Sequence, residues 1–187
     1  MTGDQDQIFE TGDELYGSAT IGFARDELHL YAYGYRRAAE VLVHHVSTNH
    51  TSLDVLVYPV VFLYRHHIEL ALKLIIRDAR ILLNELSPQK PGHRLPELWA
   101  TAKALISRVE SCDPVGLDGV DAAIAQIDSV DLRSTVFRYP EDLNGAKSLT
   151  AMTNINFFTL RDALEPVFDM LDGIHTMLST YLEEGAE

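Results

Sequence analysis

Three charged side chains recur at four-residue intervals in the segment LYRHHIELALKLIIRDAR, residues 63–80: Arg65, Glu69 and Lys73. In a helix this spacing places them on one face, where Glu69 and Lys73 form a favourable pair. That face lies only ~100° from the apolar stripe of the same segment, so it borders the core. Two interpretations stay open, namely a ladder of ion pairs that covers a helix seam and a polar pocket.

Two other segments supply side chains that could complete such a pocket. His93 lies in GHRLPELW, and Arg138 lies in VFRYPED. Tyr139 precedes a proline, which favours extended backbone, and alternation then places Arg138 and Tyr139 on opposite sides. We expect one of these two side chains to face the helices. We also expect the charged stripe to lie within reach of His93 or Arg138.

Two adjacent histidines lie in the same segment and point ~100° apart on a helix. His66 is three residues before Glu69 and so stands with the polar stripe, whereas His67 borders the apolar core. A carboxylate one turn away would hold the imidazole of His66 and raise its pKa. We expect His66, not His67, to belong to any pocket. The alternative is that both are ordinary helix residues.

The hydrophobic periodicity predicts the elements that position these side chains. The fold class is all-α, a bundle of four to five helices. Pro59 fits the first turn of the central helix, or a kink just inside it. Between the last two helices, Asn144-Gly145 is typical of a hairpin turn, so we expect a small hairpin-like insertion near 134–150. The expected helices span about 25–46, 57–86, 96–111, 120–130 and 156–182.

Length and composition favour one domain. Residues 1–18 are acidic and polar and predict a flexible N-terminal arm, and residues 19–187 predict a single helical domain. The single cysteine, Cys112, forms no intrachain disulfide, which favours a cytoplasmic location. The start of the chain lacks the features of a signal peptide. The longest apolar run, VLVYPVVFLY, is shorter than the ~20 residues that span a bilayer, so we expect no membrane association.

The formal net charge of −13 argues against a broad duplex-binding surface and leaves room for a small basic pocket. Glycine-rich phosphate loops, paired-cysteine motifs and HExxH are absent from the sequence. Helical bundles can hold metals between carboxylates and histidines. Only Asp172 precedes a histidine, His175, by three residues, so the ligand set is incomplete. We expect no cofactor and no metal.

The segments YPVVFLYRHHIELALKLII, GHRLPELW, FRYPED and NINFFTLRDAL together resemble bacterial helical domains of the HEPN type. The resemblance covers roughly residues 28 to 182. It implies an α-helical bundle that forms a homodimer and recognises RNA or a nucleotide. It also implies a partner protein in a toxin–antitoxin or phage-defence system. Active members are metal-independent endoribonucleases that use an Arg followed after four to six residues by a His.

Arg37 and His44 match that spacing, with six residues between them. The histidine would move a proton to or from the RNA, and the arginine would stabilise charge on the phosphorus centre. Two features depart from the family pattern. Ala38 follows the arginine where active members carry a polar residue, and the motif lies on the first long helix. The alternative function is a non-catalytic helical protein–protein interaction module whose charged stripe is purely structural.

Overall fold

Five α-helices form the regular structure of the computed structural model, which describes residues 17–22, 27–85, 92–110 and 116–185. No β-strand occurs in these ranges. The predicted all-α bundle is therefore confirmed. The arm predicted at residues 1–18 and Cys112 lie almost entirely outside the described residues. The helices are α1 (Glu27–Asn49), α2 (Leu53–Leu82), α3 (Leu95–Glu110), α4 (Asp118–Val130) and α5 (Phe157–Glu184).

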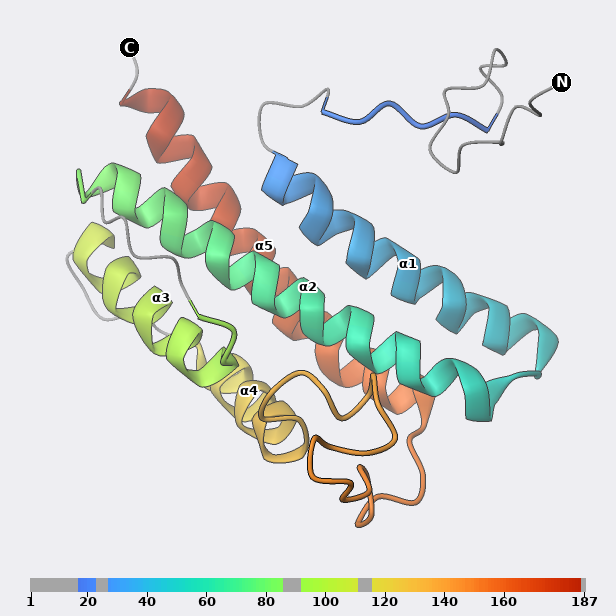
Figure 1. The fold of residues 1–187 in the computed structure, drawn as a ribbon. Coiled ribbons are helices and arrows are strands. Elements are labelled where there is room, and N and C mark those ends of the chain that lie inside the picture. The colour runs from blue at the N-terminus through green and yellow to red at the C-terminus, as the bar shows by residue number, and fades with distance from the viewer. Residues whose placement is uncertain (1–16, 23–26, 86–91, 111–115, 186–187) are drawn as a thin grey trace, which may run out of the picture.

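Helix α2 is the central element of the bundle (Figure 1). It contacts α1, α3 and α5, and α4 packs against α3 and α5. The apolar stripe of α2 supplies fully buried side chains at Ile68, Leu72 and Ile75. A helix of 30 residues that is covered on several sides buries much more of its surface than an amphipathic surface helix does.

The start of α2 differs from the prediction. The helix begins at Leu53, so Pro59 lies inside it rather than in its first turn. A proline has no N–H to donate to the carbonyl four residues earlier, here that of Val55. Val55 is 68% exposed, so its carbonyl lies in a turn that water reaches. This explains why the helix continues through the proline.

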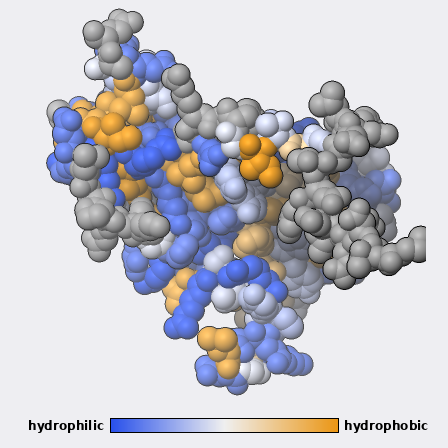
Figure 2. Space-filling model, turned by 45° about the horizontal axis from the view of Figure 1, so that its top comes forward, coloured by the Kyte–Doolittle hydropathy of each residue, from blue (hydrophilic) through white to orange (hydrophobic). Residues whose placement is uncertain are grey.

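Helix α2 is long and apolar enough to cross a membrane by length and composition. The sequence prediction considered only the shorter apolar run and missed this. Half of the 18-residue apolar stretch of α2 is buried inside the bundle, and α2 also buries the charged residues Arg65, Glu69 and Asp78. The face in Figure 2 is largely hydrophilic with separate hydrophobic patches. The structure is that of a soluble helical protein with α2 as its core helix; the cytoplasmic location stays a prediction.

Arg36 joins α1 to α5 at the surface of the bundle. Its guanidinium donates hydrogen bonds to Glu165 and Asp172, at 2.9 and 2.7 Å. It also lies 4.9 Å from the ring centroid of Phe168. Because the two carboxylates lie two turns apart on α5, one cation fixes both the position and the rotation of the helix pair.

The segment between α4 and α5, residues 131–156, folds against the start of α2 and of α5 (Figure 1). Glu141 and Lys147 form one antiparallel bridge around the Asn144-Gly145 turn, and Gly145 has a φ of 79°. The Asp142 carboxylate accepts hydrogen bonds from the Asn144 and Ala146 N–H groups, each at 2.8 Å. The hairpin-like insertion predicted near 134–150 is confirmed as this short, irregular turn.

Candidate functional site

The charged face of α2 is a buried ion-pair cluster centred on Glu69, which is 2% exposed. Its Oε1 accepts hydrogen bonds from Lys73 Nζ and from His93 Nδ1, both at 2.8 Å. Its Oε2 accepts one from Arg65 Nη1 at 3.1 Å. The structure therefore brings the charged stripe and His93 together, as the sequence predicts.

Arg65 is equally buried and joins three parts of the chain. Besides Glu69, its guanidinium donates to the carbonyl of His93 at 3.2 Å. Its Nε lies 3.9 Å from Oδ2 of Asp131, and Oδ1 of Asp131 accepts the Thr135 N–H at 2.8 Å. Arg65 thus ties α2 to the start of α3 and to the 131–156 segment. Sequence reasoning missed Asp131, which carries no local signal for this contact.

The outer part of the cluster is open to solvent. The side chain of His93 is 79% exposed and that of Lys73 is 18% exposed, whereas the side chains of Arg65 and Glu69 are buried. The two interpretations left open by the sequence therefore apply to different residues. Arg65 and Glu69 form a structural ion pair, and Lys73 and His93 present its polar edge to solvent.

The pKa of Glu69 lies below its usual range, although burial pulls it upward. Burial is the largest single cause, but the hydrogen bonds and the charges of Lys73 and His93 together outweigh it. The carboxylate is therefore ionised at neutral pH and holds Lys73 and His93 in place. It is an acceptor rather than a proton donor.

His66 stands with the polar stripe, as expected, and is half-buried. Its ring meets Tyr35 of α1 edge-on at 4.4 Å between centroids and stacks on Phe62 at 5.7 Å. Its Nδ1 lies 3.9 Å from Oε2 of Glu69. The predicted rise in the pKa of His66 is wrong, because burial lowers it more than Glu69 raises it. The imidazole is neutral at pH 7.

His67 belongs to the core. It is buried, its Nδ1 lies 2.9 Å from the carbonyl of Ala32 on α1, and its ring meets Phe168 edge-on. Burial lowers its pKa despite the hydrogen bond to Ala32. His67 is thus a neutral packing residue that joins α1, α2 and α5, and a ligand in solution does not reach it.

Arg138 lies on the exposed side of the 131–156 segment. Its guanidinium is 5.5 Å from the ring centroid of Phe62 and 5.6 Å from that of Tyr139. The extended backbone predicted here is replaced by a turn, because the Arg138 and Tyr139 N–H groups both bond to the Thr135 carbonyl. As a result Phe137 is buried, yet the Arg138 side chain still reaches Phe62 of α2. The expectation that Arg138 or Tyr139 would face the helices is therefore confirmed for Arg138.

A pocket of about 500 Å³ opens beside Arg138 at the start of α2. Tyr58 of α2 and Tyr139 line it with exposed rings, and Phe137 forms part of its wall. Tyr58 was not predicted as a site residue. It stands four residues before Phe62, so helical spacing places it on the face that carries His66. The helix predicted from the sequence begins near residue 57, so Tyr58 was not considered to share a face with Phe62 and His66.

These accessible side chains form one continuous set along α2 and its neighbours. Arg138 contacts Phe62, Phe62 stacks on His66, and His66 borders the cluster that carries Lys73. We call this set the outer strip; it comprises Tyr58, Phe62, His66, Lys73, His93, Arg138 and Tyr139.

Arg37 and His44 lie elsewhere, on the exposed surface of α1. Arg37 pairs with Glu40 at 3.3 Å, and the carbonyl of His44 accepts hydrogen bonds from Ser47 and Thr48. A separation of seven residues places both side chains on one face of the helix, ~10 Å apart along its axis. The structure does not bring them to the outer strip.

The described part of the chain holds no group of three or more His, Cys, Asp or Glu side chains that could bind a metal. Asp172 and His175, the pair considered from the sequence, are engaged separately. Asp172 binds Arg36, and His175 Nε2 lies 3.3 Å from Asp78 and 3.3 Å from the Ser179 hydroxyl. Because one nitrogen meets both groups, these three residues do not form a catalytic triad.

Comparisons of the chain with protein-family models, with curated proteins and with solved structures find no match. The resemblance to HEPN domains therefore stays a prediction from the sequence.

Proposed function

We propose that this protein binds a nucleotide, or the nucleotides of a single-stranded RNA, at the outer strip. The observation that carries the proposal is the exposed guanidinium of Arg138 between aromatic rings, beside a pocket that Tyr58 and Tyr139 line. A guanidinium matches the geometry of a phosphate, and tyrosine rings stack on bases of any sequence.

The charges of the outer strip favour the same ligand class. Arg138 places positive charge at one end of the strip, in a chain of net charge −13. Lys73 lies at the other end, where Glu69 balances its charge and its ammonium group stays partly exposed. Phe62, which Arg138 contacts, and Lys73 are 11 residues apart on α2, or ~16 Å along the helix axis. One nucleotide therefore reaches one end, whereas a short single strand reaches both. Neutral His66 between them offers a stacking surface and a hydrogen-bonding ring.

The proposal includes a role in a bacterial defence or toxin–antitoxin type system, where the protein acts as a homodimer with a possible partner protein. The support is the resemblance to HEPN domains together with the exposed apolar side chains of α1. Tyr31, Tyr33 and Val41 are each more than half exposed. Helical spacing places Tyr33 and Val41 on the same side of α1, and exposed apolar side chains that gather on one side favour a protein contact.

A ribonuclease activity is a second candidate function, and the surface of α1 favours it. Helical spacing places Arg37 and His44 on the same face as exposed Tyr33 and Val41. A two-fold dimer through that face brings two Arg37–His44 pairs together. The histidine would then take the proton of the RNA 2′-hydroxyl as that oxygen attacks phosphorus and the 5′-oxygen leaves.

A binding measurement tests the main proposal. A fluorescein-labelled single-stranded RNA of mixed sequence is titrated with the full chain and followed by anisotropy. We expect Arg138→Ala to weaken binding by about tenfold or more, because a charge-assisted contact to phosphate is lost. The matched control is Arg133→Ala, since Arg133 is an exposed arginine of the same segment. Absence of RNA binding by the wild type, or equal loss in both variants, supports the interaction-module alternative.

A further inference from the structure

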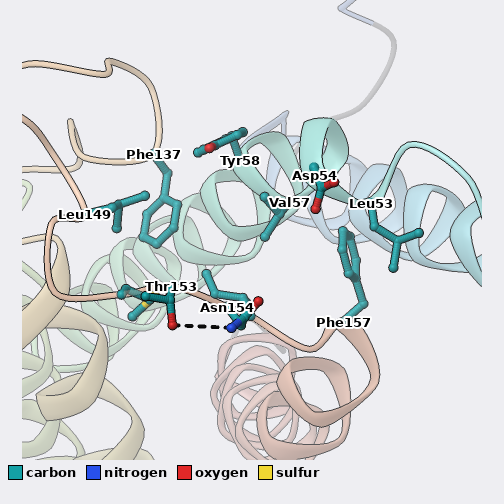
Figure 3. Close-up of a pocket in the computed structure, with 11 residues that line it drawn as sticks. Leu53, Asp54, Val57, Tyr58, Phe137, Leu149, Thr153, Asn154 and Phe157 are labelled. Atoms are coloured by element: carbon teal, nitrogen blue, oxygen red, sulfur yellow. Dashed lines mark hydrogen bonds between the residues drawn. The ribbon is translucent and has the colours of Figure 1, made fainter.

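A second pocket, of about 270 Å³, adjoins the Arg138 pocket and carries polar groups of its own. The two pockets share Tyr58, Phe137 and Leu149 as a common wall. Asp54 and Val57 line the second pocket from α2, and Thr153 and Asn154 line it from the segment that leads into α5 (Figure 3). The sizes of the two pockets are close to those of small-molecule sites, roughly 300–1,000 Å³.

The carboxylate of Asp54 faces this pocket as an acceptor without a partner in the described part of the chain. Asp54 lies in the first turn of α2 and is exposed, and it forms no hydrogen bond or ion pair there. The side-chain amide of Asn154 donates one hydrogen bond, to the Thr153 hydroxyl at 3.3 Å, which leaves its carbonyl oxygen available. The pocket thus combines an apolar and aromatic wall with a few convergent polar groups.

The chemistry of an ionised carboxylate selects among the bases. It accepts hydrogen bonds and donates none. Guanine presents two adjacent donors on its pairing edge, a ring N–H and an amino group, so both carboxylate oxygens find a partner. Adenine and cytosine place a ring acceptor beside the amino group, and uracil places carbonyl oxygens on both sides of its one N–H. These three bases therefore set an oxygen or nitrogen lone pair against Asp54.

We propose that this second pocket recognises a guanine base, with Asp54 reading its pairing edge, while Arg138 holds the attached phosphate in the adjoining pocket. The shared residues Tyr58 and Phe137 offer rings against which the base stacks. The inference rests on the proposed nucleotide-binding function and adds a base preference to it. Neither Asp54 nor Asn154 belongs to the charged stripe or to the Arg37–His44 motif.

The test compares GMP, AMP, CMP and UMP by calorimetric titration of the full chain. Wild type should bind GMP more tightly than the other three, by roughly five- to 150-fold, the range that one bidentate base contact provides. Asp54→Asn replaces one acceptor by a donor and should shift the preference from GMP towards AMP, since an asparagine amide pairs with adenine. Asp118→Asn is the matched control, because Asp118 is an exposed aspartate in the first turn of α4.

The outcomes separate the inference from the function on which it rests. If wild type binds all four nucleotides equally and Asp54→Asn changes nothing, the guanine site is wrong while nucleotide binding stands. If Asp54→Asn and Asp118→Asn lose GMP binding equally, the assignment to Asp54 is also wrong. If wild type binds none of the four, both proposals fail. Equal melting temperatures for the two variants ensure that the comparison concerns folded protein.

Discussion

Glu69 on α2 accepts a hydrogen bond from Nδ1 of His93 at 2.8 Å, although 24 positions separate the two residues in the chain. The contact closes a ring of hydrogen bonds, because Arg65 donates both to Glu69 and to the backbone carbonyl of His93. The residues just before α3 are therefore held against α2 by polar contacts from His93 to Arg65 and Glu69, which are both buried.

Removing the charge of Glu69 should destabilise the fold strongly. Glu69→Gln breaks the buried ion pair with Arg65 and leaves that guanidinium only the more distant carboxylate of Asp131, at 3.9 Å. Breaking a buried ion pair typically costs about 3–5 kcal/mol. Urea denaturation followed by circular dichroism measures the change. Glu97→Gln is the control, because Glu97 pairs with Arg94 at the surface and such pairs contribute about 0–1 kcal/mol. Equal losses in the two variants would contradict a buried structural role for Glu69.

The two adjacent histidines should separate binding from stability. His67→Ala removes a buried ring that packs on Phe168, so we expect a loss of about 2–5 kcal/mol, as for other large-to-small core substitutions. His66→Ala should weaken binding of the labelled RNA and change stability much less. Denaturation and anisotropy are measured on both variants. A folded His67→Ala protein that alone loses RNA binding would overturn the assignment of His66 to the outer strip.

Stability should fall as the pH drops below the ordinary histidine range. Burial lowers the pKa of His67 below 6.5 in the folded state, so the unfolded chain binds its proton first. The resulting loss begins near pH 6.5 and continues down to the folded-state pKa. His67→Gln keeps a donor for the Ala32 carbonyl and does not titrate, so its melting temperature should vary less between pH 7 and 5. An unchanged pH profile would contradict this linkage.

Glu69 contributes in a separate pH window. Its folded-state pKa is below 4.5, so its stabilisation is complete above that pH and is lost as the pH falls through the folded-state pKa. The effect of His67 is therefore measured without interference from Glu69 when the pH stays at 5 or above.

The exposed face of α1 should mediate self-association. Light scattering at micromolar concentration should give twice the 20.9 kDa of one chain. Val41→Asp introduces a charge on this face, which should give monomers, because the substitution buries two like charges near a two-fold axis. Leu143→Asp is the control, since Leu143 is fully exposed on the hairpin-like insertion. A wild-type mass of one chain removes the homodimer prediction.

Ribonuclease activity should depend on Arg37 and on the dimer. The assay follows cleavage of a fluorescent RNA in the presence of EDTA. Arg37→Ala should reduce the rate by about 100-fold or more, the range for loss of one group that stabilises transition-state charge. Arg80→Ala, on α2, controls for a general loss of positive charge. Equal rates for wild type and Arg37→Ala would leave binding without catalysis.

Local patterns in the sequence already determined the helices and the charged face. Arg65, Glu69 and Lys73 share a face because helical geometry alone sets the direction of residues four apart. The turn at Asn144-Gly145 is equally local, since glycine adopts the positive φ that the turn requires. Asn156 precedes α5 and caps it by accepting the Phe158 and Thr159 N–H groups, a role that short-range chemistry specifies.

Tertiary structure decided which of these side chains are buried and which meet solvent. The pKa of His66 falls chiefly because the ring is buried, and Tyr35 of α1 is one of the side chains against which it packs. No residue beside His66 in the sequence indicates that contact. Asp131 meets Arg65 only because the 131–156 segment returns to α2. Whether a side chain is buried, and which residues from other segments it contacts, depends on packing between segments that are distant in the sequence. The spacing of side chains within one helix is fixed by the backbone. The sequence therefore determined that Arg65, Glu69 and Lys73 share one face of a helix. The packing of the bundle determined that Arg65 and Glu69 form a buried ion pair, whereas Lys73 remains partly exposed.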